Sequence, residues 1–209
     1  MEQNKFATAQ EAFWAGEFGT HYIARNQGDQ LLAANLNFFA KAMRQTGRIS
    51  SCLEFGANIG MNLKALNLLF PGIEASAVEI NNEAVQQLSS VIPAGNIHHQ
   101  SILEYVPTQT FDLALIKGVL IHMHPDVLPE VYDTLVGATA RYLLVAEYYS
   151  PAPVAIPYHG HEKRLFKRDF AGEIMDRHPA MQLCDYGFVY HRDPLFPQDD
   201  ITWFLMEKR

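Results

Sequence analysis

The most constraining feature of this sequence is a glycine turn between an apolar run and a helical pattern of leucines. The pattern predicts a strand over 50–56, a turn through Gly56 and Gly60, and a helix over 61–70. Glycine adopts backbone angles that are closed to other residues, and the amides at the helix start point into the space beside the turn. Such a turn can hold a nucleotide-like molecule, although an ordinary strand-to-helix turn explains the glycines equally well.

Two neighbours of this turn favour a ligand. Glu79 ends the next apolar run, predicted as a strand over 73–80, and lies 19 residues beyond Gly60. That spacing places a carboxylate where it can accept hydrogen bonds from ribose hydroxyls. Asn58 takes the place of the second glycine of the dinucleotide fingerprint, which pyrophosphate needs for its close approach. The predicted ligand is therefore nucleotide-like but carries no pyrophosphate.

Strand-like and helical segments alternate through the rest of the chain. Such alternation predicts a mainly parallel sheet with right-handed crossovers and helices on both faces. The last two strand-like runs predict a terminal antiparallel hairpin. The fold class is therefore α/β, a Rossmann-like sandwich with a seven-stranded sheet. The remaining predicted elements are helices over 82–91, 126–138 and 169–178, and strands over 96–100, 111–117, 141–148, 182–191 and 200–208.

The N-terminal 48 residues carry two helical patterns separated by Asn26-Gln27-Gly28. We expect them to form a helical cap (1–48) on a core (49–209), within a single domain over 1–209, because a chain of this length suits one core. Tyr22 and Arg25 lie in the first pattern. They either pack and carry a solvated charge, or belong to a lid over the glycine turn.

Composition narrows the class of protein. A hydrophobic content of 48% argues against disorder, and a net charge of −7 without a long basic run argues against a nucleic-acid partner. The first residues lack an apolar signal region, and no apolar stretch is long enough to span a membrane. We therefore expect a cytoplasmic protein without a membrane partner. Cys52 and Cys184 lie in apolar segments and are predicted to be buried, reduced thiols.

The carboxyl ends of the strands bind the ligands of such sheets. The first end, Glu54-x-Gly56-x-Asn58-x-Gly60, resembles the first motif of the class I S-adenosylmethionine-dependent methyltransferases, whose strand-end acid lies near the ligand's amino-acid portion. Ser101-Ile102 stands where that class has an acid for the adenine amino group and an apolar residue beside the ring; a hydroxyl is a weaker partner than a carboxylate. The resemblance implies S-adenosylmethionine as cofactor, S-adenosylhomocysteine as product, and cofactor contacts from Glu54, Gly56, Ala57, Asn58, Gly60, Glu79, Ile80, Ser101, Ile102, Lys117 and Gly118.

The segment after the predicted strand 111–117 contains a Leu-x-His element that resembles the one near the sulfonium in small-molecule methyltransferases. His122 is the first candidate base for an acceptor hydroxyl, with Glu147 and Tyr149 as rivals or orienting groups. The alternative is a histidine that packs under the following helix. The histidine pairs at 122/124 and 159/161 lack accompanying carboxylate or cysteine ligands, so we predict no metal site.

A proline-rich segment over 149–168 is predicted to be a long loop at the ligand edge of the sheet. It ends in a basic cluster just before a helix that starts after Asp169, where cations oppose the helix dipole. The cluster either holds a carboxylate or phosphate of the acceptor or is a solvated patch neutralised by nearby acids. The predicted acceptor contacts are Tyr22, Arg25, Tyr158, His159, Arg164, Lys167 and Arg168.

Six motifs are spread along nearly the whole chain. They are Phe13-Trp14-x-Gly16-Glu17-Phe18-Gly19, Tyr22-x-x-Arg25-Asn26, the glycine turn, Glu147-Tyr148-Tyr149, Leu165-Phe166-Lys167-Arg168-Asp169-Phe170-Ala171 and the run from Phe188 to Phe204. Together they resemble those of the pseudaminic acid biosynthesis-associated methylases. The resemblance implies an enzyme that methylates an oxygen or nitrogen of an acidic nonulosonic sugar, its precursor or its nucleotide-activated form, for surface glycans. Two alternatives stay open: a nicotinamide-dependent sugar oxidoreductase or epimerase, and a non-catalytic S-adenosylmethionine-binding protein.

Overall fold

The computed structural model describes residues 6–158 and 161–209, with side chains at all of them except 158 and 161–164. None of the helices in this described part is both long and apolar enough to cross a membrane. The α-helices are α1 (Ala9–Ala15), α2 (Glu17–Ile23), α3 (Asp29–Ala42), α4 (Met61–Leu69), α5 (Asn82–Leu88), α6 (Leu128–Ala138) and α7 (Phe170–Arg177). The strands are β1 (Ser51–Phe55), β2 (Glu74–Glu79), β3 (Ile97–His99), β4 (Phe111–Lys117), β5 (Thr139–Glu147), β6 (Val154–Tyr158), β7 (His161–Lys167), β8 (Met181–Phe188) and β9 (Thr202–Lys208).

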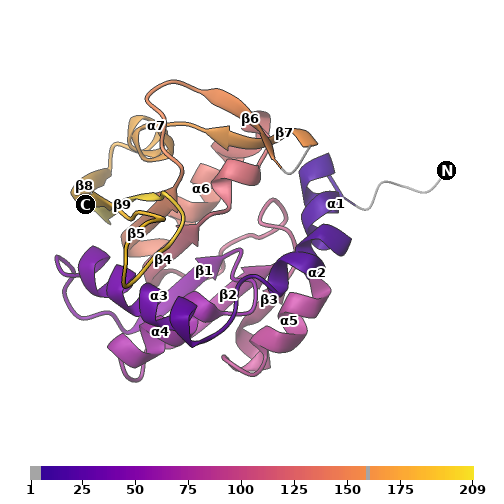
Figure 1. Cartoon of the computed structure of the whole chain (residues 1–209). Helices are drawn as coiled ribbons and strands as arrows, with labels where there is room; N and C mark the ends of the chain where they lie inside the picture. The colour runs from indigo at the N-terminus through magenta and orange to yellow at the C-terminus, as the bar shows by residue number, and fades with distance from the viewer. Residues whose placement is uncertain (1–5, 159–160) are drawn as a thin grey trace.

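The main sheet has seven strands in the order β3-β2-β1-β4-β5-β9-β8 (Figure 1). β1 to β5 pair in parallel, whereas β9 is antiparallel to both β5 and β8. The predicted α/β sandwich with a seven-stranded sheet and a C-terminal antiparallel hairpin is confirmed. In this order the carboxyl ends of β1, β2, β3 and β4 lie side by side, which is the arrangement that builds a ligand site.

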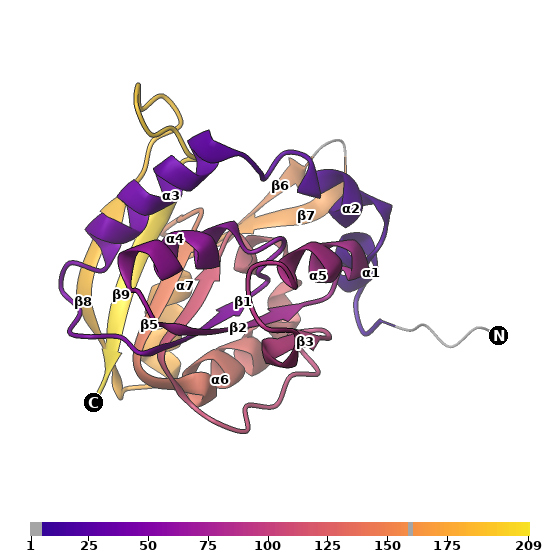
Figure 2. The ribbon, with the colours of Figure 1, turned by 90° about the horizontal axis from the view of Figure 1, so that it is seen from below.

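Each face of the sheet is buried by its own set of helices, which Figure 2 shows on opposite sides of the strands. Side chains alternate between the faces along β1: Leu53 and Phe55 pack with α6 and α7, whereas Cys52 packs with α3 and α4. All three are fully buried. Because both faces are covered, the central strands are apolar runs, and this is why the sequence pattern located them.

The N-terminal segment differs from the two predicted helices. Gly16 is extended (φ −95°, ψ −159°) and separates α1 from α2. The two helices cross so closely that a Cβ at Gly19 would lie 1.9 Å from the Trp14 carbonyl oxygen. α3 packs on α4, and its Phe38 and Phe39 are buried in the core. Of the predicted cap, α1 and α2 therefore flank the ligand end of the sheet, whereas α3 is part of the core.

The predicted proline-rich loop is wrong in part, because 154–167 contains a second, two-stranded sheet of β6 and β7. Pro157 lies within β6, where the register shifts between Ile156 and Tyr158. A proline is tolerated there because an irregular position in a two-stranded sheet needs no N–H from it. The prediction for the cysteines is also wrong in part: both are free, but Cys184 is exposed on β8.

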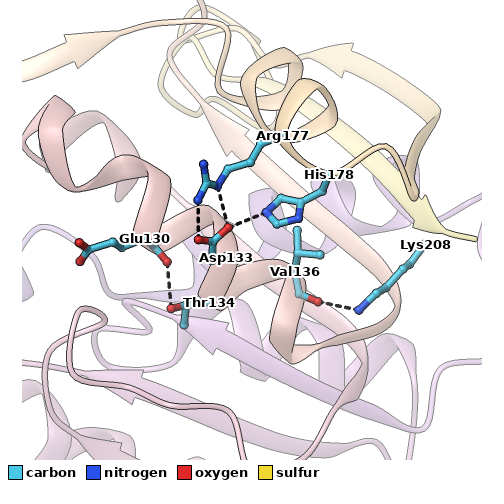
Figure 3. Close-up of polar contacts among 7 residues, drawn as sticks. All are labelled: Glu130, Asp133, Thr134, Val136, Arg177, His178 and Lys208. Carbon is cyan, nitrogen blue, oxygen red and sulfur yellow. Dashed lines mark hydrogen bonds and ion pairs between the residues drawn. The ribbon is translucent and has the colours of Figure 1, made fainter.

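The helices behind the sheet are joined by a polar cluster, drawn in Figure 3. Asp133 on α6 accepts two hydrogen bonds from Arg177, each at 2.7 Å, and lies 2.9 Å from His178 Nε2. Lys208 of β9 donates to the Val136 carbonyl at 2.8 Å. These contacts connect α6 to the end of α7 and to β9 of the hairpin, and so fix the positions of these elements relative to one another.

Candidate functional site

A cavity of about 530 Å³ opens at the carboxyl ends of the central strands. Residues that follow β1, β2, β3 and β4 form one wall, and α1, α2, α3 and the segment between β8 and β9 form the other. The volume is in the range of small-molecule sites, roughly 300–1,000 Å³. The cavity therefore lies at the edge of the sheet where the sequence predicted a ligand.

The two glycines of the turn have different roles. Gly56 (φ 73°) lines the cavity, and a Cβ there would lie 2.6 Å from Val119 Cγ2. Gly60 (φ 80°) does not line it, and a Cβ there would lie 2.6 Å from Leu88 Cδ1 of α5. Gly60 is therefore required by its left-handed backbone and by the packing of α4 on α5, rather than by a close ligand.

Asn58 holds the centre of the turn in a left-handed conformation (φ 48°), which asparagine adopts more readily than most residues. Its backbone N–H donates to Glu79 Oε2 at 2.7 Å, and Glu79 Oε1 accepts from the backbone N–H of Asn81 at 2.7 Å. Burial raises the pKa of the Glu79 carboxyl, while these amide donors lower it. Asn58, Glu79, and the predicted Ala57 and Ile80 all line the cavity. Among the described residues, the buried Asn58 Oδ1 has no hydrogen-bond partner.

Glu54 lies behind the cavity wall instead of in it. Its side chain is 1% exposed, and Asn62, which does line the cavity, donates to its Oε1 at 2.6 Å. Burial raises the pKa of Glu54 to about 8, while Asn62 and the ammonium of Lys117 lower it. Lys117 lines the cavity; burial lowers its pKa, and the nearby Glu54 raises it. Gly118 (φ 69°) also lines the wall.

His122 lines the cavity and is 6% exposed. It ends a 3-10 turn (Leu120–His122) that follows β4. Its ring lies 4.6 Å from the indole of Trp14 on α1, measured between ring centroids. Trp14 also lines the cavity, so α1 covers the side chain of the predicted base, His122.

The other two predicted catalytic residues do not line the cavity. Glu147 accepts backbone hydrogen bonds from Val119 and Leu120, each at 2.9 Å, and burial raises its pKa to about 7. It therefore fixes the segment that carries His122. Tyr149 is 42% exposed, and its ring lies 5.9 Å from that of Phe204.

The predicted basic cluster is not brought to the cavity by its described side chains. The ammonium of Lys167 lies 5.1 Å from the ring centre of Tyr148, and Arg168 donates to Glu173 Oε1 at 2.7 Å. Neither cation lines the cavity. Glu173 on α7 neutralises Arg168, which matches the alternative of a neutralised patch. The side chains of Tyr158 and Arg164, and the whole of His159, lie outside the described residues.

Tyr22 of α2 and Arg25, which lies two residues beyond the end of α2, line the cavity, as a lid would. Burial and the nearby Asp199 raise the pKa of Tyr22. The wall also contains Asn35 of α3 and Gln198, which sequence reasoning missed. Gln198 Nε2 donates to Asn35 Oδ1 at 3.1 Å across 163 residues of sequence. No local sequence pattern predicts a contact between residues so far apart in the chain, so only the folded structure shows it.

Ser101 and Ile102, which follow β3, line the cavity and are 5% and 9% exposed. The Ser101 hydroxyl contacts Glu11 of α1, another residue that sequence reasoning missed. Within residues 6–158 and 161–209, no group of three or more histidine, cysteine, aspartate or glutamate side chains is arranged to hold a metal ion.

No family model matches this chain, and no curated protein matches its sequence. Solved structures do match its fold. The mitomycin 7-O-methyltransferase MmcR matches over 97% of this chain and 61% of its own, with a TM-score of 0.69 and 13% identity. The magnesium protoporphyrin IX methyltransferase of Synechocystis PCC 6803, solved with bound SAM, matches over 99% and 100%, with a TM-score of 0.66 and 14% identity.

A third similar structure is a Burkholderia thailandensis methyltransferase, 1,6-didemethyltoxoflavin-N1-methyltransferase, with its substrate and S-adenosylhomocysteine bound. It matches over 99% of this chain and 92% of its own, with a TM-score of 0.70 and 19% identity. At these identities the likeness concerns architecture. The chain has the Rossmann-like fold of these methyltransferases, with β9 inserted antiparallel between β5 and β8.

Proposed function

We propose that the protein is an S-adenosylmethionine-dependent methyltransferase. The observation that carries this proposal is the hydrogen bond between the left-handed turn at Asn58 and the Glu79 carboxylate, because both residues line a cavity of ligand size. The last strands of the surrounding sheet also have the order found in methyltransferases. Asn58 stands where nicotinamide enzymes have the glycine that lets the pyrophosphate approach the backbone. The antiparallel β9 also differs from the all-parallel dinucleotide sheet.

The residues present fit this cofactor. Glu79 retains a lone pair for a ribose hydroxyl, because its two oxygens offer about four acceptor sites and the backbone amides of Asn58, Ile80 and Asn81 use three of them. Asn58 Oδ1, which has no hydrogen-bond partner among the described residues, and the amides that begin α4 would receive the amino-acid portion, and Ile102 would flank the base. When bound, the cofactor supplies a methyl group on a sulfonium, which is already an activated leaving group.

The protein then needs to align the acceptor and to exclude water. Trp14 and Tyr22 close the cavity from the side of α1 and α2. His122 would take the proton of an acceptor hydroxyl. The contact between its ring and that of Trp14 would hold the imidazole in place. Glu147 serves this step indirectly, because it anchors the backbone immediately before His122.

The acceptor is proposed to be an acidic sugar or its nucleotide-activated form. Two things support this finer assignment. The motifs along the chain resemble those of pseudaminic acid-associated methylases, and the cavity wall includes the cations of Arg25 and Lys117. Arg25 is exposed at the cavity and suits bidentate recognition of a carboxylate.

The test is transfer of a labelled methyl group to a panel of sugars that includes carboxylated, nucleotide-linked and neutral members, with product masses as the readout. We expect a carboxylated member to gain one methyl group. Arg25→Gln should raise KM for that acceptor by tenfold or more, whereas His21→Gln, a change at an exposed site four residues earlier on α2, should leave it unchanged. Methylation of neutral sugars alone would contradict the acidic acceptor, and no transfer to any member by a protein that binds the cofactor would favour a non-catalytic role.

A further inference from the structure

One corner of the cavity, beyond the end of β3, is closed by helix α1. Glu11 of α1 and Ser101 both line this corner and are 8% and 5% exposed. The Ser101 hydroxyl contacts Glu11 Oε1, although the two residues are 90 positions apart. A carboxylate from the N-terminal helix is therefore built into the wall next to Ser101 and Ile102.

The hydrogen-bonding capacity of Ser101 is largely used. A serine hydroxyl has one proton to donate and two lone pairs. Because a carboxylate oxygen can only accept, the proton is committed to Glu11. One lone pair accepts the Leu103 amide at 3.0 Å. Ser101 is therefore left with a single neutral acceptor site for any ligand.

Glu11 has more to offer. Its Oε2 accepts the Thr8 amide at 2.8 Å and the Thr8 hydroxyl at 3.3 Å, which completes the capping box of α1. Its Oε1 contacts Ser101 and keeps a second lone pair. Hydrogen bonds to a carboxylate are roughly twice as strong as those to a neutral oxygen, so Glu11 is the stronger acceptor in this corner.

This inference rests on the proposed function. If the cofactor is S-adenosylmethionine, the order of the strands indicates which part of it reaches this corner. The amides that start α4, after β1, suit the carboxylate of the amino-acid portion, and Glu79 at the end of β2 suits the ribose. The base then lies toward β3, the next strand in the sheet. Its exocyclic amino group is a pure donor and needs an acceptor.

We propose that Glu11 binds the amino group of the cofactor's adenine and so supplies, from helix α1, the charged acceptor that position 101 lacks. Ser101 then acts as a positioning residue that holds the Glu11 carboxylate. The N-terminal helix becomes part of the cofactor site, in addition to covering His122 through Trp14.

The experiment compares the affinities of two compounds by calorimetry on the full chain. One is S-adenosylhomocysteine, and the other is the same molecule with purine in place of adenine, so that only the amino group is missing. We expect the wild-type protein to bind the adenine compound at least about tenfold more tightly, the effect of one charge-assisted hydrogen bond. In Glu11→Gln the ratio should fall to about threefold or less, because a neutral amide replaces the carboxylate while glutamine still completes the capping box.

Glu17→Gln, at an exposed acid in the first turn of α2, is the matched control and should keep the wild-type ratio. A thermal melt of each variant checks that α1 remains folded. A Glu11→Gln variant that keeps the wild-type ratio, whether or not Ser101→Ala lowers it, or wild-type protein that binds both compounds equally, would overturn this inference while the cofactor assignment stands. Wild-type protein that binds neither compound would instead overturn the proposed function, and this inference with it.

Discussion

The amide of Asn58 donates a hydrogen bond of 2.7 Å to Oε2 of Glu79, which locks the first turn of the fold to the end of the neighbouring strand. The contact joins a left-handed residue to a carboxylate that is 7% exposed. It makes the shape of the turn depend on the same side chain that is proposed to hold the ribose. Ligand contact and loop geometry are therefore linked at one residue.

Replacing Glu79 by glutamine should weaken the binding of S-adenosylmethionine by tenfold or more. Glutamine keeps the size of the side chain but removes its charge, and hydrogen bonds to charged groups contribute about 1.5–3 kcal/mol each. Calorimetric titration measures the change, and Glu74→Gln at the exposed start of the same strand is the control. Equal affinity of the Glu79 variant and the wild type would mean that the ribose is held elsewhere.

Replacing Gly60 by alanine should lower the free energy of unfolding more than replacing Gly72 by alanine. Both glycines have positive φ, 80° and 85°, so both substitutions carry the strain of a left-handed alanine, about 1–2 kcal/mol. A Cβ at Gly60 also overlaps Leu88, whereas no described residue places an atom within 4 Å of one at Gly72. Overpacking adds about 1–3 kcal/mol. Urea unfolding measures both, and equal losses would show that α5 moves aside freely.

The stability of the ligand-free protein should fall as the pH rises from about 5 to about 7. Burial raises the pKa of Glu54 to about 8 and that of Glu147 to about 7, from the ordinary glutamate value of 4.5. Between the unfolded and folded pKa values the folded state holds a proton that the unfolded state has lost. Each group therefore lowers the free energy of unfolding by at most about 1.4 kcal/mol per pH unit in this window. Above the folded pKa the effect levels off.

Urea unfolding at pH 5, 6 and 7 measures this slope, and Glu54→Gln identifies its source. Glutamine does not titrate and can still accept from Asn62. We expect the variant to lose part of the slope and to keep the part that Glu147 and Glu79, whose pKa burial also raises, contribute. A wild-type protein whose stability is flat or rises over this range would contradict the account of these buried acids.

Replacing His122 by alanine should lower kcat for a hydroxyl acceptor by about a hundredfold or more, the size of a general-base contribution. The affinity for the cofactor should change little, because His122 follows β4 rather than the β1 to β3 ends. Single-turnover transfer of a labelled methyl group measures the step, and His21→Ala is the control at an exposed histidine of α2. Wild-type turnover by the His122 variant would show that alignment alone is sufficient.

Much of the fold could be predicted because its signals are local. The strand over 111–117 has the predicted bounds, since a strand buried on both faces reads as one apolar run. The glycine turn was also readable, because left-handed backbone restricts which residues can occupy it. Gly60 shows the limit of that reasoning: the sequence marks a glycine but not whether a ligand or Leu88 requires it.

The parts that escaped prediction depend on contacts between distant segments. Glu11 meets Ser101, and Gln198 meets Asn35, only after the sheet has assembled. The prolines of 151–157 suggested a loop, yet the chain pairs as β6 and β7, because Pro157 falls at a register shift. Arg168 was predicted to face a ligand, but Glu173, one helical turn along α7, pairs with it.

Calorimetric titration of the full chain with S-adenosylhomocysteine and, separately, with NAD tests the cofactor assignment. We predict saturable binding of S-adenosylhomocysteine at one site per chain, weakened by Glu79→Gln, and no heat of binding with NAD. Saturable binding of NAD together with no binding of S-adenosylhomocysteine would contradict it.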